Sequence, residues 1–69
     1  MSVVLSEHQR MFLLDELSKR LSVEGAIRPI ALSIGIAYPV LLDIKNKKRT
    51  RFYTATLVKV AAYYGIMVQ

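Results

Sequence analysis

The sequence has 69 residues, no cysteine and a single histidine, which excludes a core held by disulfides or by a zinc ion with cysteine and histidine ligands. Its hydrophobic content of 54% and mean hydropathy of +0.34 are high for so small a chain and favour an apolar surface that a second subunit covers. The net charge of +5 is unevenly spread: residues 1–24 hold three basic and four acidic residues, and residues 25–69 hold seven basic residues and one acidic residue, so the second part suits a polyanion.

The first predicted helix begins after Ser6. Gln9 follows Ser6 at the spacing of a capping box, in which each side chain satisfies a backbone N–H group at the start of a helix. Apolar residues then recur at helical spacing and predict one buried face: Met11, Leu14, Leu17 and Leu21. Polar residues occupy the other side: Asp15, Ser18 and Lys19. Gly25 lies just past this pattern and is predicted to end the helix.

Two shorter helices are predicted next, separated by a tight turn. The first covers about residues 27–34. Pro29 lies in its first turn, where the helix loses no intrahelical donor. Three of its residues are predicted to face the core: Ile30, Ala31 and Ile34. Gly35 supplies the left-handed backbone conformation of the turn. The second covers about residues 38–45, begins after Ala37 and again has a proline in its first turn. Three of its residues are predicted to face the core: Val40, Leu41 and Ile44.

The fourth predicted helix carries a stripe of residues at helical spacing that stops at Gly65: Leu57, Val60, Ala61 and Tyr64. Thr50 and Thr54 are both candidates for its N-cap. The apolar ends, Val3–Leu5 and Ile66–Val68, either pair as short strands or meet a second subunit, and the sequence does not choose between them. We therefore predict one all-α domain over the whole chain, a compact bundle of four to five helices.

The spacing within residues 27–46 is the strongest signal in the chain. It places a small residue where two helices cross, a glycine in the turn and apolar residues at the buried sites of two helices that meet near a right angle: Ile30-Ala31, Ile34-Gly35-Ile36, Leu41 and Ile44. This pattern resembles the helix-turn-helix of the phage repressor and Cro superfamily, also called the xenobiotic-response-element family. The stretch ALSIGIAYPVLLDIKNKK resembles the family's run of alanine, glycine, recognition helix and basic turn. The stretch LVKVAAYYGI resembles its fourth helix, so the likeness covers about residues 26–66.

The resemblance implies a lambda-repressor-like fold and DNA binding. In that family the second helix of the motif lies in the major groove, the turn after it contacts phosphates, and two subunits bind a palindromic site. On matching positions, the resemblance implies that five residues face the bases: Ala37, Tyr38, Pro39, Leu42 and Asp43. It implies phosphate contacts from the residues that follow: Lys45, Asn46, Lys47, Lys48, Arg49 and Arg51. Lys47 stands where the family often has glycine, with Asn46 before it as the residue for the left-handed conformation.

The residue types agree with phosphate binding and depart from the family at the base-reading surface. Basic side chains at the density of residues 45–51 neutralise phosphates and release counterions, and Arg28 is a further phosphate candidate. The family usually has glutamine, serine, threonine or arginine where this chain has four less polar residues: Tyr38, Pro39, Val40 and Leu42. Leu42 or Val40 suits a thymine methyl group. Tyr38 suits a phosphate or a base, and Asp43 suits the amine of cytosine.

The sequence thus predicts a sequence-specific regulator of transcription, a repressor of phage or plasmid type that binds an operator in double-stranded DNA as a homodimer. The subunit contact is expected at residues near the C-terminal end: Tyr63, Ile66, Met67 and Val68. The alternative is a protein-binding module of the same fold, an antirepressor or antitoxin partner with weak DNA binding. It binds a repressor or toxin through the apolar face around Tyr38, Val40 and Leu42. A third option is nonspecific nucleic-acid binding through the basic turn alone.

Enzymatic, metal-binding and membrane functions find no support in the sequence. It has no nucleophile elbow, no glycine-rich phosphate loop and no pair of histidines or carboxylates placed for acid–base catalysis, so no cofactor and no metal is predicted. His8, beside the N-cap, is expected to be a surface residue. The longest uncharged stretch, residues 29–42, is interrupted by Gly35 and Pro39 and is shorter than the ~20 residues of a spanning helix. With no basic residue ahead of its first apolar residues, as a signal peptide has, the chain is expected to be cytoplasmic.

Overall fold

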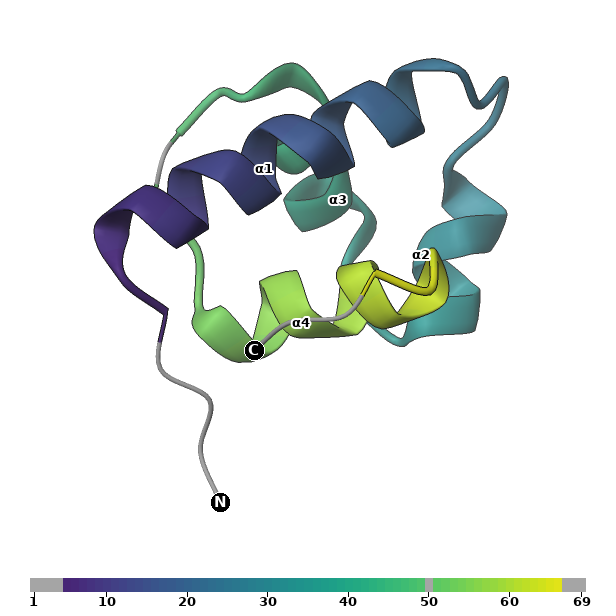
Figure 1. Cartoon of the computed structure of the whole chain (residues 1–69). Coiled ribbons are helices and arrows are strands. Elements are labelled where there is room, and N and C mark those ends of the chain that lie inside the picture. The colour runs from purple at the N-terminus through teal and green to yellow at the C-terminus, as the bar shows by residue number, and fades with distance from the viewer. Residues whose placement is uncertain (1–4, 50, 67–69) are drawn as a thin grey trace.

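Four α-helices make up the regular structure of the residues that the computed structural model describes, 5–49 and 51–66. The helices are α1 (Glu7–Ser22), α2 (Arg28–Ile34), α3 (Tyr38–Asn46) and α4 (Thr54–Tyr63) (Figure 1). The prediction of an all-α fold is confirmed, and the described residues contain no strand. None of these helices is long and apolar enough to cross a membrane.

The two apolar ends do not form strands where they are described. Leu5 is buried in the helical core, and Ile66 is partly buried against it. The remaining residues of the two predicted ends lie outside the described residues: Val3, Val4, Met67 and Val68.

α1 begins at the predicted capping box, which is confirmed. The Ser6 N–H donates to Gln9 Oε1 at 2.9 Å, and the Gln9 N–H donates to Ser6 Oγ at 3.1 Å. The predicted buried face is wrong at two positions, because Met11 is 50% exposed and Ser18 is buried. Both α3 and α4 pack against α1, so its buried face is wider than the predicted stripe and also includes Leu13.

α1 ends at Ser22, three residues before Gly25. The Glu24 N–H donates to Leu21 O at 3.1 Å, a tight last turn that closes the helix without a left-handed residue. The residues with positive φ do not include Gly25. The prediction that Gly25 ends this helix is therefore wrong.

The turn between α2 and α3 has the backbone that Gly35 was predicted to supply. Gly35 has φ 85° and ψ 33°, and its N–H and that of Ile36 both donate to Ala31 O, at 2.8 and 3.1 Å. A side chain at this φ would be strained, which explains the glycine. Within one residue, α2 and α3 have their predicted bounds.

α4 begins at Thr54, with Tyr53 as its N-cap. Thr54 already has the helical conformation, so its prediction as the N-cap is wrong; Thr50, the other candidate, lies outside the described residues. Most of the predicted stripe is confirmed by burial: Leu57, Val60 and Ala61. Gly65, with φ 70°, follows the helix as predicted, and the Ile66 N–H donates to Ala61 O at 2.9 Å.

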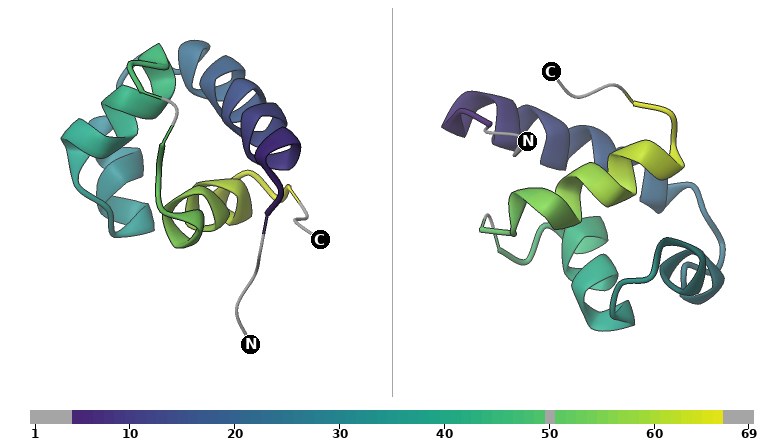
Figure 2. Two further views of the ribbon diagram at one scale, coloured as in Figure 1. Left: turned by 90° about the vertical axis from the view of Figure 1, so that its left-hand side faces the viewer. Right: turned by 90° about the horizontal axis from the view of Figure 1, so that it is seen from below.

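The hydrophobic core lies where α1 packs against α3 and α4, and α2 completes it by packing against α3 and α4 (Figure 2). Six side chains are almost completely buried: Leu17, Leu21, Leu41, Ile44, Leu57 and Val60. The predicted inward residues of α2 also belong to the core, because Ile30 and Ala31 are buried and Ile34 packs against it. Val40 on α3, like Ile34, is partly buried and packs against the core, in agreement with its predicted inward position.

Candidate nucleic-acid interface

α3 has one face in the core and one toward solvent. Four residues at spacings of three and four share the outer face, opposite the buried Leu41 and Ile44: Pro39, Leu42, Asp43 and Asn46. Ala37 is exposed as the N-cap, and Tyr38 lies half-buried at the edge of this face. The five predicted base-reading residues therefore lie on or beside one surface of α3.

Asn46 belongs to α3 and not to the turn after it. The prediction of a left-handed Asn46 is wrong, because α3 continues one residue further than predicted and Lys47 takes that conformation, with φ 51° and ψ 41°. The Lys48 N–H donates to Asp43 O at 3.1 Å and closes the end of the helix. Asn46 is thus exposed and in line with Pro39 and Asp43 on the outer face.

The conformation of Lys47 yields a prediction about stability. A left-handed residue other than glycine costs roughly 1–2 kcal/mol, so Lys47→Gly is expected to raise the free energy of unfolding by about 1 kcal/mol. The ion pair between Lys47 and Asp15 is lost, but an exposed pair contributes little. Urea denaturation measures the change. Asn46→Gly is the control, because glycine inside α3 is expected to lower stability by about 1 kcal/mol; equal destabilisation by both variants would contradict the assignment of the left-handed residue.

Arg28 places a cation beside the start of α3. Its guanidinium carbon is 4.4 Å from the centroid of the Tyr38 ring, a cation–π contact between the first residues of α2 and α3. Arg28 is exposed, so its charge remains accessible to a ligand.

The predicted phosphate-binding residues after Asn46 form a basic segment, residues 47–51, that follows α3 directly. Lys47 Nζ is 3.0 Å from Asp15 Oδ1, and Lys48 and Arg51 are exposed with no ion pair inside the described residues. The hydrogen bond from Lys47, together with Lys19, holds the pKa of Asp15 below its usual range. This pair is therefore intact at neutral pH, and its stabilising effect is lost only as the pH falls through the lowered pKa.

Asp43 is the one acidic residue in the basic part of the chain, and it lies on the outer face of α3. Arg49 Nε is 3.5 Å from Asp43 Oδ2. An unpaired carboxylate at this place would repel a polyanion, and the ion pair offsets that repulsion.

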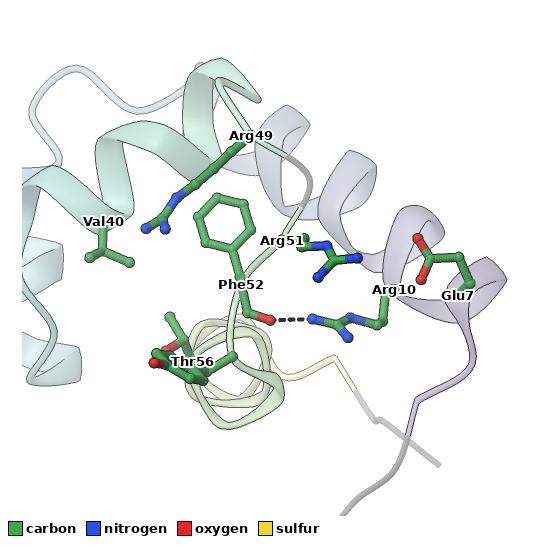
Figure 3. Close-up of a pocket in the computed structure, with 8 residues that line it drawn as sticks. Glu7, Arg10, Val40, Arg49, Arg51, Phe52 and Thr56 are labelled. Atoms are coloured by element: carbon green, nitrogen blue, oxygen red, sulfur yellow. Dashed lines mark hydrogen bonds between the residues drawn. The ribbon is translucent and has the colours of Figure 1, made fainter.

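Three contacts that position this surface were missed by the sequence analysis. Ser18 Oγ donates to Lys45 O at 2.6 Å and fixes the last turn of α3 to α1. Arg10 on α1 donates to the carbonyl oxygen of Phe52, whose buried ring lies 4.6 Å from the Arg49 guanidinium carbon (Figure 3). Two local features of the sequence accompany these contacts, a serine next to an apolar stripe and an aromatic residue after a basic run, but neither indicates its distant partner.

The predicted subunit-contact residues have different surroundings. Tyr63 is 48% exposed and meets the Tyr64 ring edge-on, with centroids 5.1 Å apart. Burial raises the pKa of Tyr64, and the nearby negative charge of Glu24 raises it further by a smaller amount. Ile66 packs against the core of its own chain, and Met67 and Val68 lie outside the described residues. His8 is exposed, as predicted.

The outer face of α3, on which Pro39 and Asn46 are exposed and Leu42 and Asp43 are partly buried, thus has Arg28 near its start and the basic segment after its end. Such a surface can bind a polyanion. Comparison with known proteins adds no relative: no protein-family model matches the chain, and no similar curated protein or solved structure was found. Function is therefore inferred from these side chains and their geometry.

Proposed function

We propose that the protein binds double-stranded DNA, with the outer face of α3 toward the base edges of the major groove. The observation that carries this proposal is the presence of cations at both ends of α3. A helix with its side chains is about 10–12 Å in diameter, which fits the major groove, about 12 Å wide. Arg28 and the basic segment, near opposite ends of α3, can then reach phosphates while the outer face meets the bases.

The fold narrows this proposal further. Two helices joined by three residues, with Ala31 buried in the core and Gly35 in the turn, support a helix-turn-helix protein with a lambda-repressor-like fold. We assign it to the phage repressor and Cro type: a repressor of transcription that occupies an operator as a homodimer. No catalytic step, cofactor or metal is needed for this function.

The outer face of α3 sets the mode of base reading. Leu42 contacts a thymine methyl group, and Asp43 accepts from the amine of cytosine. Asn46, on the same face, suits the pair of groups that adenine presents in the major groove. Lys48 and Arg51 supply sequence-independent contacts to phosphates.

The alternative of a protein-binding module is less well supported by the placement of its contact residues. It requires Tyr38, Val40 and Leu42 on one surface. Tyr38 and Val40 are two positions apart, about 200° around a helix, and Val40 lines a pocket with Arg49 and Phe52 on another side of α3. The apolar residues of α3 therefore do not form the continuous patch that a protein partner would cover.

Selection of duplexes from a random DNA pool tests the proposed function. The expected consensus has two inverted half-sites about one helical turn apart. Asp43→Asn is expected to change the preference at one base position by about tenfold. Glu16→Gln on α1 is the matched control, because it removes a carboxylate that also pairs with an arginine, Arg20, at 3.4 Å. A pool without any consensus would contradict sequence-specific binding, and an unchanged consensus for Asp43→Asn would contradict base reading by Asp43.

A further inference from the structure

A pocket of about 570 Å³ lies beside α3, between the start of α1 and the segment that joins α3 to α4. Eight residues line it, among them Glu7 and Arg10 from α1, and Figure 3 shows seven of them labelled. Its volume is in the range of small-molecule sites, about 300–1,000 Å³. The predicted phosphate contacts include two of its lining residues, Arg49 and Arg51, but neither the pocket nor Arg10 belongs to the predicted surface.

The pocket gathers positive charge. Arg10, Arg49 and Arg51 line it, and Glu7 is the one acidic lining residue. In Figure 3 the guanidinium groups of Arg10 and Arg51 point toward one another. No ion pair within the described residues joins Glu7 to either of them. Like charges brought together repel, and an anion between them reverses the sign of that interaction.

The arginines are also held in place. Arg10 donates to the carbonyl oxygen of Phe52, and Arg49 is stacked on the Phe52 ring at 4.6 Å. A planar guanidinium presents paired N–H donors that match the oxygens of a phosphate group. Arg49 is also paired with Asp43 at 3.5 Å, so Arg10 and Arg51 provide the donors suited to a tetrahedral anion.

Beside the arginines the pocket has an apolar part: Val40, Phe52 and Tyr53. Tyr53 is 85% exposed, so its ring is available to a ligand. A bare inorganic anion would leave this part of the pocket unused. An anion that carries an aromatic or other apolar group would fill both parts.

We propose that this pocket binds a phosphate monoester with an apolar substituent, with the phosphate at Arg10 and Arg51 and the substituent against Val40 and Tyr53. Binding itself does not depend on the proposed DNA binding. Its regulatory consequence does rest on that function: Arg51 belongs to both surfaces, so an occupied pocket withdraws this cation from the DNA interface and lowers DNA affinity.

Phenyl phosphate is the probe, titrated into the whole chain by isothermal calorimetry at constant ionic strength. At about pH 7.5 the probe is a dianion, because its second pKa is about 6. Inorganic phosphate and dimethyl phosphate are the comparison ligands; the second reproduces the diester of a DNA backbone. Saturable binding of phenyl phosphate, tighter than that of either comparison ligand, is expected. Equal affinity for dimethyl phosphate would overturn the proposal and indicate that the pocket binds a phosphate of the DNA backbone.

Two variants with opposite expected effects locate the ligand. Arg51→Gln is expected to weaken phenyl phosphate binding about tenfold, the usual effect of losing a hydrogen bond to a charged group. Glu7→Gln is expected to tighten it several-fold, because a carboxylate that faces the anion is removed. Lys59→Gln is the matched control, since it removes a charge from an exposed site on α4 outside the pocket. An equal loss in Lys59→Gln and Arg51→Gln, or no effect of Glu7→Gln, would overturn the proposal.

A parallel DNA titration separates this proposal from the proposed function. DNA binding without saturable phenyl phosphate binding would overturn the pocket alone. Phenyl phosphate binding without any DNA binding would overturn the proposed function alone. When both ligands bind, phenyl phosphate is expected to reduce the DNA affinity of the wild-type protein. In Arg51→Gln the concentration of phenyl phosphate needed for the same reduction should be about tenfold higher, because this variant binds phenyl phosphate about tenfold more weakly.

Discussion

Replacing Lys47, Lys48 and Arg49 together with glutamine is expected to lower the affinity for every DNA sequence by roughly 100-fold or more at moderate salt. Each cation that leaves a phosphate removes about 0.9 from the slope of log affinity against log salt, so the slope should fall by about 2.7. Gel-shift titrations at several salt concentrations measure both quantities. The fold should survive, because all three side chains are exposed and their ion pairs are of the weak surface type.

The control for this experiment removes the same total charge from other surfaces: Lys19→Gln, Arg20→Gln and Lys59→Gln. Lys19 and Arg20 lie near the end of α1, and Lys59 lies on α4. The control variant keeps the same net charge as the first, so a difference between the two reports location and not total charge. Equal losses of affinity in the two variants would contradict a docking surface at the end of α3.

Ile44→Ala is expected to destabilise the protein by about 2–5 kcal/mol, because the side chain is completely buried and the surrounding helices cannot close the cavity. A chain of 69 residues has a total stability of roughly 3–10 kcal/mol. This one change is therefore expected to leave much of the protein unfolded at 37 °C, a temperature about 8–28 °C below the midpoints usual for such domains. Thermal unfolding followed by circular dichroism measures it.

Leu32→Ala is the matched control, since Leu32 is 79% exposed on α2. Removing an apolar side chain from an exposed site usually changes stability by less than about 0.5 kcal/mol. A loss comparable to that of Ile44→Ala would contradict the exposure of Leu32 in solution and would indicate that a second subunit covers α2.

The helices could be predicted because their signals are local. The capping box at Ser6 and Gln9, the glycine of the turn at Gly35 and the stripe before Gly65 each depend on residues within a few positions, and the structure has all three. The errors at the ends have the same cause. The possible end points of α1 before Gly25, and the possible starting points of α4, each differ by about one turn of helix. Local sequence preference does not distinguish between them.

The supporting contacts of the candidate site could not be predicted, because they join residues far apart in the chain. Ser18 and Lys45 are 27 positions apart, and Arg10 and Phe52 are 42 positions apart. Periodicity places Ser18 on the outside of α1, and only the packing of α3 against α1 gives its hydroxyl a buried partner. Which cations form the basic segment was evident from the sequence, whereas the inclusion of Asn46 in α3 depended on which residue tolerates the left-handed conformation.

The stacking of Arg28 on Tyr38 has a consequence for the thermodynamics of binding. A long side chain that becomes immobilised on binding loses roughly 0.5–1.5 kcal/mol of conformational entropy. Arg28, at 4.4 Å from the Tyr38 ring, and Arg49, at 4.6 Å from the Phe52 ring, are already confined in the free protein. These two arginines, near opposite ends of α3, are therefore already ordered before a ligand binds and lose little conformational entropy on binding. Lys48, in contrast, must become ordered during association.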